Sequence, residues 1–214
     1  NFEGMKMKYL VSVVLFIVVS ILPVSVQADE SGQKAVLITG ASTGLGRAMA
    51  ELIASEGHFV YAGARKDKDM AELNAIENVQ AVRLDVTDPE QITAAVKTIE
   101  ASGRGLHGLI NNAGVGVLYP LTDVPQSEIE WLMDVNLYGP VRVTQAFAPL
   151  IIESRGRIST TGSISGILSG KAFGPYSMSK HAMEAFTDSL AVEMEPLGVH
   201  LKSASHILTT FCFL

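Results

Sequence analysis

The sequence predicts a single doubly wound α/β domain, in which helices cover both faces of a parallel sheet. Two observations lead to this prediction. From residue 33 onward, short apolar runs alternate with amphipathic stretches, which is typical of parallel strands joined by right-handed helical crossovers. A glycine-rich turn, TGASTGLG, separates the first strand from the first helix. The length of 214 residues suits one domain of medium size.

The elements are predicted from apolar periodicity and from the residues that begin and end helices. Buried apolar runs predict strands at residues 34–39, 58–63, 79–86, 106–114 and 156–162. Spacing of three and four residues predicts helices at 45–57, 88–103, 126–153 and 174–195, with a weaker helix in the charged segment after residue 63. Asp88 is the expected N-cap of the second of these, and Pro196 stops the last.

Composition excludes several classes of function. The formal net charge is −6 and no long basic run occurs, so nucleic-acid binding has no electrostatic support. The one cysteine, Cys212, excludes an internal disulfide framework and a cysteine-rich metal site. The histidines show no metal-ligand spacing, so no metal is expected; they are His58, His107, His181, His200 and His206. The sequence contains no G-x-S-x-G elbow, so a serine hydrolase has little support.

The first 28 residues are predicted to be a signal peptide or a membrane anchor. Lys6 and Lys8 precede an apolar run that begins at Leu10, and small residues at Val26 and Ala28 fit cleavage after Ala28. The run is close to the lower length limit for a bilayer span, so an uncleaved anchor is the alternative. A buried N-terminal strand or helix is the third interpretation. We therefore expect an exported, periplasmic or membrane-anchored protein, with a cytoplasmic domain if the segment only anchors it.

The glycine-rich turn is the expected site of a dinucleotide pyrophosphate, at the N-terminus of the first helix. Gly40 permits the sharp turn, Gly44 lets the backbone approach the phosphates, and Gly46 allows close helix packing. The residues expected to contact the cofactor here are Gly40, Ser42, Thr43, Gly44, Leu45 and Gly46.

The end of the second predicted strand indicates which cofactor is preferred. An acid there would bind the ribose 2′-hydroxyl, whereas an arginine accommodates a 2′-phosphate. The sequence places Ala64 there, followed by Arg65 and Lys66, which favours NADP(H) over NAD(H). The alternative is that these cations are solvated and that Asp67 faces the ribose. The adenine is expected beside the end of the third strand, at Asp85 and Val86.

Five motifs in order resemble those of the short-chain dehydrogenase/reductase family, in the branch whose glycine motif is TGxxxGxG. They are TGASTGLG, NNAG at residues 111–114, DVNLYG with Asn136, TGSISG with Ser163, and YSMSK at residues 176–180. The resemblance covers roughly residues 34–200. It implies that residues 33–200 form a Rossmann-like, NAD(P)-binding oxidoreductase domain.

Tyr176 and Lys180 lie four residues apart, so a helix places both on one face. Tyrosine side chains ordinarily have a pKa of about 10, and acting as a base near pH 7 requires about 4 kcal/mol. An ammonium group ~4 Å away, at an effective dielectric constant of ~20, supplies about that much. A tyrosine–lysine pair of this kind therefore suits proton transfer to or from an alcohol oxygen.

The resemblance also implies a role for each residue of the reactive cluster. Tyr176 would be the acid/base, and Lys180 would tune it and hydrogen-bond the nicotinamide ribose. Ser163 would hold the substrate oxygen, with Ser165 as the alternative, and Asn136 would anchor a water in the proton relay. The residues expected on the cofactor side of the sheet edge are Asn111, Asn112, Ala113 and Gly114.

The resemblance ends at about residue 201. Family members continue into a Pro-Gly turn and a segment that covers the substrate, whereas this chain has SASHILTTFCFL. Residues 201–214 are therefore expected to be an atypical tail produced by truncation or a shifted reading frame. That change would leave an edge strand unpaired.

The sequence thus predicts an NAD(P)-dependent oxidoreductase that interconverts a secondary alcohol and a ketone, on a lipophilic or small carbonyl substrate. The alternative is a catalytically inactive, truncated nucleotide-binding protein of the same fold. An epimerase or dehydratase of the extended branch is disfavoured by the glycine spacing. The expected partner is a small-molecule substrate, and the family resemblance implies association with further copies of the chain through the helices around Trp131 and Tyr176. Membrane association is expected only through the N-terminal segment.

Overall fold

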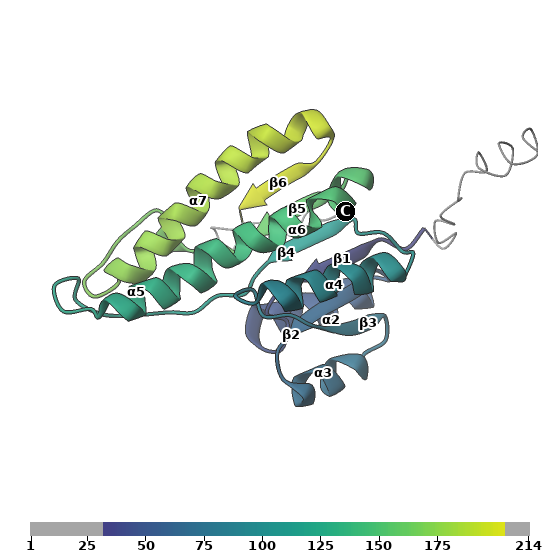
Figure 1. The fold of residues 1–214 in the computed structure, drawn as a ribbon, viewed down its shortest axis with the longest axis horizontal. Coiled ribbons are helices and arrows are strands. Elements are labelled where there is room, and N and C mark those ends of the chain that lie inside the picture. The colour runs from purple at the N-terminus through teal and green to yellow at the C-terminus, as the bar shows by residue number, and fades with distance from the viewer. Residues whose placement is uncertain (1–31, 204–214) are drawn as a thin grey trace, which may run out of the picture.

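The computed structural model describes residues 32–203, and its centre is a six-stranded parallel sheet with the order β3-β2-β1-β4-β5-β6 (Figure 1). The strands are β1 (Ala35–Ile38), β2 (Phe59–Ala64), β3 (Val79–Arg83), β4 (Gly108–Asn111), β5 (Arg157–Thr160) and β6 (His200–Ser203). The chain builds outward from β1 to β3 and then returns to the other side of β1. This order confirms the doubly wound, Rossmann-like prediction, and it places a topological switch point between β1 and β4.

Helices cover both faces of the sheet (Figure 1). Those on one face are α2 (Gly44–Ser55) and α3 (Asp67–Asn74). Those on the other face are α4 (Pro89–Ala101), α6 (Gly139–Glu153) and α7 (Gly174–Met194). Helix α5 (Gln126–Met133) runs into α6 through a π-helical segment, η1 (Asp134–Tyr138), and two short 3₁₀ segments are η2 (Ile164–Gly166) and η3 (Glu195–Leu197).

Strands β1, β2 and β4 at the centre of the sheet are buried on both faces, as their continuous apolar sequences require, whereas the residues of β6 are exposed or half-buried. Successive residues of β1 point to opposite faces. Leu37 therefore packs in the layer with α4 and α6, while Val36 and Ile38 pack in the layer with α2. Gly57 and Gly103 follow the ends of α2 and α4 with positive φ, as their predicted places at helix ends require.

Several predicted boundaries differ from the structure. β3 ends at Arg83, so Asp85 and Val86 lie in the loop after the strand. The predicted boundary between domain and tail, at residue 200, stays a prediction; Leu201, just after it, pairs with Ile158 in β6. Strand pairing therefore continues into the segment expected to be atypical, because backbone hydrogen bonds tolerate a change of side chains.

Some predictions concern residues outside the described range. Among the helices of residues 32–203, none is both long and apolar enough to cross a bilayer. The predicted signal peptide or anchor at residues 1–28 lies outside that range and stays a prediction. Residues 204–214, which include Cys212 and His206, also lie outside that range, so the prediction of an atypical tail there stays a prediction.

Candidate active site

The glycine turn and the end of β4 meet at the switch point of the sheet. Gly40, directly after Thr39, has φ +64°, and a Cβ there would lie 2.9 Å from the Cα of Ala113. Any side chain at this position would therefore be strained in its backbone and would push the two loops apart. Glycine is required here for the close approach of the two loops.

Thr39 and Asn112 hold these two loops together. The Thr39 hydroxyl oxygen accepts hydrogen bonds from the backbone N–H groups of Asn112 at 2.9 Å and Ala113 at 3.0 Å. In return, the side-chain amide of Asn112 donates to the carbonyl oxygens of Thr39 at 3.0 Å and Gly40 at 3.1 Å. Asn112 is predicted to line the cofactor, but its Nδ2 group is used to fix the shape of the turn. The neighbouring Asn111 is buried and donates to the Thr144 hydroxyl at 2.9 Å.

The N-terminus of α2 has the features that a pyrophosphate needs. A Cβ at Gly46 would lie 2.3 Å from the Gly40 carbonyl oxygen, so only glycine allows the helix to start this close to the turn. Gly44 has φ +57°, and a Cβ at this position would meet nothing within 4 Å, which leaves the backbone open to a ligand. Thr43 forms no side-chain capping bond, so its hydroxyl does not compete for the first backbone N–H groups. Ser42 is half-buried, whereas Thr43 and Leu45 are exposed.

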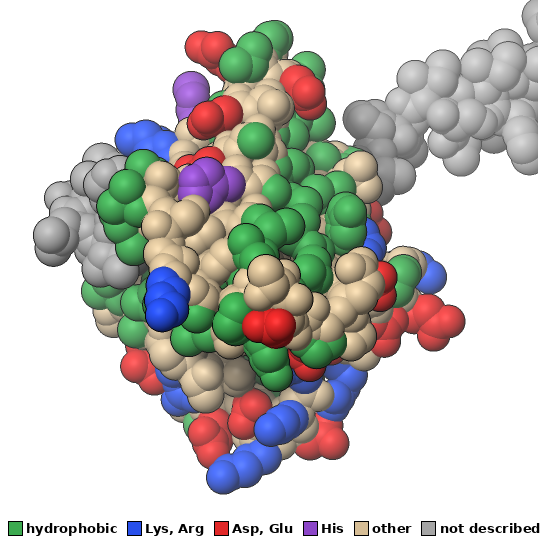
Figure 2. All heavy atoms as spheres, turned by 90° about the vertical axis from the view of Figure 1, so that its left-hand side faces the viewer, with side chains coloured by type: hydrophobic (Ala, Val, Ile, Leu, Met, Phe, Trp, Pro, Cys, Tyr) green, Lys and Arg blue, Asp and Glu red, His purple; other side chains and the backbone are tan. Residues whose placement is uncertain are grey.

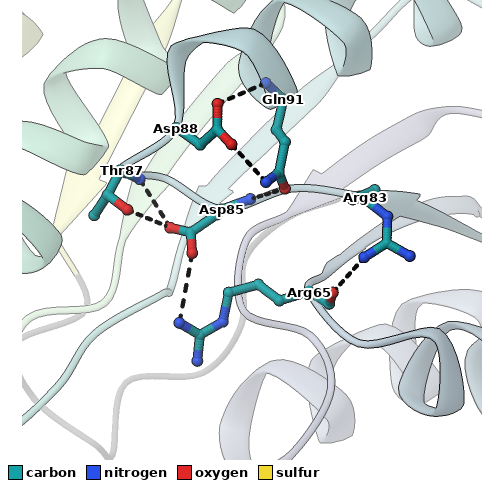
Figure 3. Close-up of polar contacts among 6 residues, drawn as sticks. All are labelled: Arg65, Arg83, Asp85, Thr87, Asp88 and Gln91. Carbon is teal, nitrogen blue, oxygen red and sulfur yellow. Dashed lines mark hydrogen bonds and ion pairs between the residues drawn. The ribbon is translucent and has the colours of Figure 1, made fainter.

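Arg65 lies at the end of β2 and faces the loop after β3 (Figure 3). Its guanidinium Nη1 is 3.6 Å from Asp85 Oδ2. Burial alone would raise the pKa of Asp85. Hydrogen bonds from the backbone and hydroxyl of Thr87, together with the charge of Arg65, outweigh this effect and hold the Asp85 pKa below its ordinary value. The structure therefore brings together Arg65 and Asp85, two of the predicted cofactor residues.

Arg83, which the sequence did not single out, fixes the segment that follows β2. It forms an ion pair with Asp67, the alternative ribose contact. It also donates to the carbonyl oxygen of Arg65 at 2.5 Å (Figure 3). Val86 is buried, and a Cβ at Gly139 would lie 2.6 Å from its Cγ2. The side chain of Val86 therefore packs against the start of α6.

Tyr176 and Lys180 share one face of α7, as their spacing predicted. Lys180 Nζ lies 5.9 Å from the centroid of the Tyr176 ring and donates to the carbonyl oxygen of Thr161 at 2.7 Å. Lys180 is only 7% exposed. Burial lowers the pKa of Lys180, and the charge of Glu184 acts in the opposite direction. Thr161 and Glu184 were not among the predicted site residues.

Ser163 and Ser165 occupy different environments after β5. The Ser163 hydroxyl caps η2 by accepting from the backbone N–H of Ser165 at 3.1 Å, and Ser163 is half-buried. Ser165 is buried within η2, which packs against α7. Of the two, Ser163 is therefore the more accessible to a substrate.

Asn136 lies in the π-helical segment η1 and is 2% exposed. Its Oδ1 accepts from the backbone N–H of Val115 at 2.8 Å, while its Nδ2 donates to the Val115 carbonyl at 2.9 Å and to the Ser179 hydroxyl at 3.1 Å. Both N–H donors are thus used, and one lone pair of Oδ1 is left for a water. Gly114 adjoins this oxygen, because a Cβ there would lie 3.4 Å from it. Ser179, the second serine of YSMSK, was not among the predicted site residues.

Exposed apolar side chains surround the start of α7. The loops after β4 and β5 adjoin each other, since the Tyr119 N–H donates to the Ala172 carbonyl at 2.8 Å. We call their exposed side chains the apolar rim: Leu118, Tyr119, Leu121, Ile164, Ile167, Leu168 and Phe173. Figure 2 shows hydrophobic side chains gathered on this end of the molecule.

Within residues 32–203, no cluster of histidine, cysteine or acidic side chains has the grouping to hold a metal ion.

The strand order, the glycine turn against α2 and the Tyr176–Lys180 pair define an α/β domain of the dinucleotide-binding class. A family model described as short chain dehydrogenase matches residues 34–207. The chain therefore belongs to the short-chain dehydrogenase family, as the ordered motifs predicted.

Relatives and solved structures show the same family. The mitochondrial D-beta-hydroxybutyrate dehydrogenase of Bos taurus is 39% identical over 181 residues, which cover 80% of this chain and 53% of that protein. A short-chain dehydrogenase of Penicillium crustosum is 39% identical over 173 residues, covering 80% of this chain and 64% of that protein. The crystal structure of a short-chain dehydrogenase from Streptomyces avermitilis superposes with a TM-score of 0.77 at 32% identity, covering 82% of this chain and 65% of that one.

A short-chain dehydrogenase/reductase from Burkholderia phymatum, solved in complex with NAD, has a TM-score of 0.75 at 30% identity, covering 80% of this chain and 64% of that one. The chain thus spans between about half and two thirds of the length of the relatives described here.

Proposed function

We propose that this chain is a nicotinamide-dependent oxidoreductase that interconverts a lipophilic secondary alcohol and its ketone, with NADP(H) preferred over NAD(H). The observation that carries the proposal is the Tyr176–Lys180 pair on α7, at the same edge of the sheet as the open glycine turn. Proton transfer to the substrate oxygen and cofactor binding would then occur side by side.

Each residue of the cluster has a chemical task in this proposal. The Tyr176 hydroxyl donates a proton to the carbonyl oxygen in reduction and takes it back in oxidation. The Lys180 ammonium, 5.9 Å from the ring centroid, stabilises the negative charge on the tyrosine oxygen. The Ser163 hydroxyl holds the substrate oxygen, and Asn136 holds a water behind Lys180 through its remaining lone pair. The nicotinamide, when bound, supplies or accepts the hydride.

The cofactor preference rests on the charges beside the end of β2. Ala64 offers no carboxylate to a ribose 2′-hydroxyl, and Asp67 is paired with Arg83. The Arg65 side chain is 67% exposed, and its ion pair with Asp85, at 3.6 Å, is a long one. A guanidinium that is held this loosely can turn to a 2′-phosphate.

The proposed substrate class rests on the apolar rim around the start of α7. The rim contributes leucine, isoleucine, tyrosine and phenylalanine side chains. A lipophilic substrate would gain about 25 cal/mol for each Å² of apolar surface that it buries there. This composition favours a larger apolar alcohol over a small hydroxy acid such as the hydroxybutyrate named in a relative.

The proposed function is tested by titrating the purified chain with NADPH and NADH and following nicotinamide fluorescence. We expect tighter binding of NADPH, and we expect Arg65→Ala to remove the preference while Lys68→Ala, an exposed control on α3, keeps it. Oxidation is then measured with 3-hydroxybutyrate and with secondary alcohols of increasing chain length. Cofactor binding without oxidation of any alcohol would support the inactive, nucleotide-binding alternative.

Self-association is a further part of the proposal. Trp131, Tyr138 and Met178 are exposed large side chains on the continuous stretch from α5 to η1 and on α7, and these elements pack together. Burial of such side chains between two copies would stabilise a dimer. Sedimentation velocity of the chain and of Trp131→Ser would test this, with a monomer at all concentrations contradicting it.

A further inference from the structure

A carboxylate lies one helical turn beyond Lys180. Glu184 follows it by four residues on α7, so the two side chains project from the same face. Helical side chains lean toward the N-terminus of their helix, so the Glu184 side chain lies alongside the backbone of Lys180, while the Lys180 side chain leans toward Tyr176. A Cβ at Gly166 would lie 3.0 Å from Glu184 Cγ, 3.1 Å from its Oε1 and 3.2 Å from the Lys180 carbonyl oxygen. The Glu184 side chain therefore lies over η2 and beside the backbone of Lys180.

The sheet holds this carboxylate in place. The hydroxyl of Ser203, the last residue of β6, donates to Glu184 Oε1 at 3.0 Å. β6 is also the strand that packs against α7 and pairs with β5. Glu184 is thus fixed between η2 on one side and the edge strand on the other.

Lys180 needs a nearby negative charge, because its surroundings otherwise disfavour the ammonium. The group is buried, and its hydrogen-bond acceptor is the uncharged carbonyl of Thr161. Burial of a charge beside neutral partners destabilises the charged form. Glu184 is the carboxylate whose charge opposes this effect.

Within residues 32–203, the other titratable groups around Lys180 do not supply a fixed negative charge. Tyr176 lies on the same face of α7 as Lys180, and its hydroxyl is the group that exchanges the proton in the proposed reaction. His181 is exposed and bonds the Ser177 carbonyl through Nδ1 at 2.8 Å. Lys202 of β6 is exposed and has the same sign as Lys180, and Asp188, one turn beyond Glu184, is exposed.

We propose that Glu184, held by Ser203 of β6, is a positioning residue that keeps the Lys180 ammonium charged beside Tyr176. Strand β6 is thereby linked to the Tyr176–Lys180 pair through the Glu184 carboxylate. The effect on Tyr176 rests on the proposed function, whereas the effect on Lys180 itself does not.

The first test measures the charge of Lys180 without turnover. The full chain is pulse-labelled with limiting acetic anhydride across a pH series, and acetylation of Lys180 is quantified by peptide mass spectrometry. Glu184→Gln is expected to move the midpoint of Lys180 labelling to lower pH by about one unit. Ser203→Ala, which keeps the carboxylate but removes its anchor, is expected to move it in the same direction by less. Asp188→Asn is the matched control and should leave the midpoint in place.

Two outcomes would overturn the proposal. In one, circular dichroism shows that the Glu184→Gln protein is folded, yet Lys180 is labelled with the wild-type midpoint. If Glu184→Gln does not fold, an unshifted Lys180 midpoint in Ser203→Ala has the same meaning. The other is an equal shift in the Asp188→Asn control, which would show that any acid of α7 acts alike.

A second readout uses the reaction. In Glu184→Gln the alkaline limb of the pH profile of alcohol oxidation should move to lower pH, because the ammonium is lost sooner. A wild-type chain that binds cofactor but oxidises no alcohol would contradict the proposed function, and the labelling experiment would still decide the role of Glu184.

Discussion

Replacing Thr39 with valine is expected to destabilise the protein, although the two side chains have nearly the same shape. The lost hydroxyl oxygen is the acceptor for two backbone N–H groups, at 2.9 and 3.0 Å, in the loop after β4. Each buried N–H group left without a partner costs about 1–3 kcal/mol. Both groups here are only partly buried, so we expect about 2–4 kcal/mol in total. For a domain of this size, that loss corresponds to a fall in Tm of roughly 4–16 °C.

The assay is urea unfolding followed by circular dichroism, with the midpoint compared at equal m-value. Thr39→Ser keeps the hydroxyl and is expected to recover most of the loss, whereas Thr43→Val changes an exposed hydroxyl of the same turn and should have little effect. Cofactor affinity should fall with stability in Thr39→Val, because the loop that it releases borders Gly40. A Thr39→Val protein within about 0.5 kcal/mol of the wild type would refute the reasoning.

Three other predictions concern the turn, the acid/base and the far edge of the sheet. Gly46→Ala places a Cβ 2.3 Å from a backbone oxygen, so it should lower the free energy of unfolding by about 1–3 kcal/mol or more and weaken NADPH binding in fluorescence titrations. Tyr176→Phe should lower kcat about 10²–10⁴-fold with unchanged NADPH affinity. Tyr138→Phe, the control, should keep a kcat near that of the wild type. Burial and the charge of Lys34 lower the pKa of His107, so the unfolded chain binds the proton more tightly and stability falls as pH drops below about 6.5. His107→Gln should reduce that acid loss in unfolding experiments between pH 7 and 5.

Each of these predictions has an outcome that contradicts it. Gly116→Ala meets no atom within 4 Å and controls for the loss of a glycine, so equal destabilisation by both alanines would contradict the steric argument. Undiminished turnover in Tyr176→Phe would remove that residue from the acid/base role. Parallel stability curves for His107→Gln and the wild type would show that another group causes the acid loss.

Local pattern was enough to predict most of the fold and part of the site. The order of strands and helices follows from apolar periodicity, because each element buries its own stripe or face. The turn at Gly40 and the i, i+4 relation of Tyr176 and Lys180 are likewise local, since they depend on chain geometry over a few residues. The predicted strand at 79–86 was too long because an apolar residue such as Val86 can be buried against a helix as well as within a sheet.

The sequence by itself determined the class of fold, the position of the glycine turn and the placing of Tyr176 and Lys180 on one face of a helix. The tertiary structure alone decided how these parts are held. Thr39 bonds a residue 73 positions away, Asn136 bonds Ser179 across 43 positions, and Ser203 reaches Glu184 across 19. A single polar side chain has no periodicity, so its partner is fixed only when packing brings the two elements together.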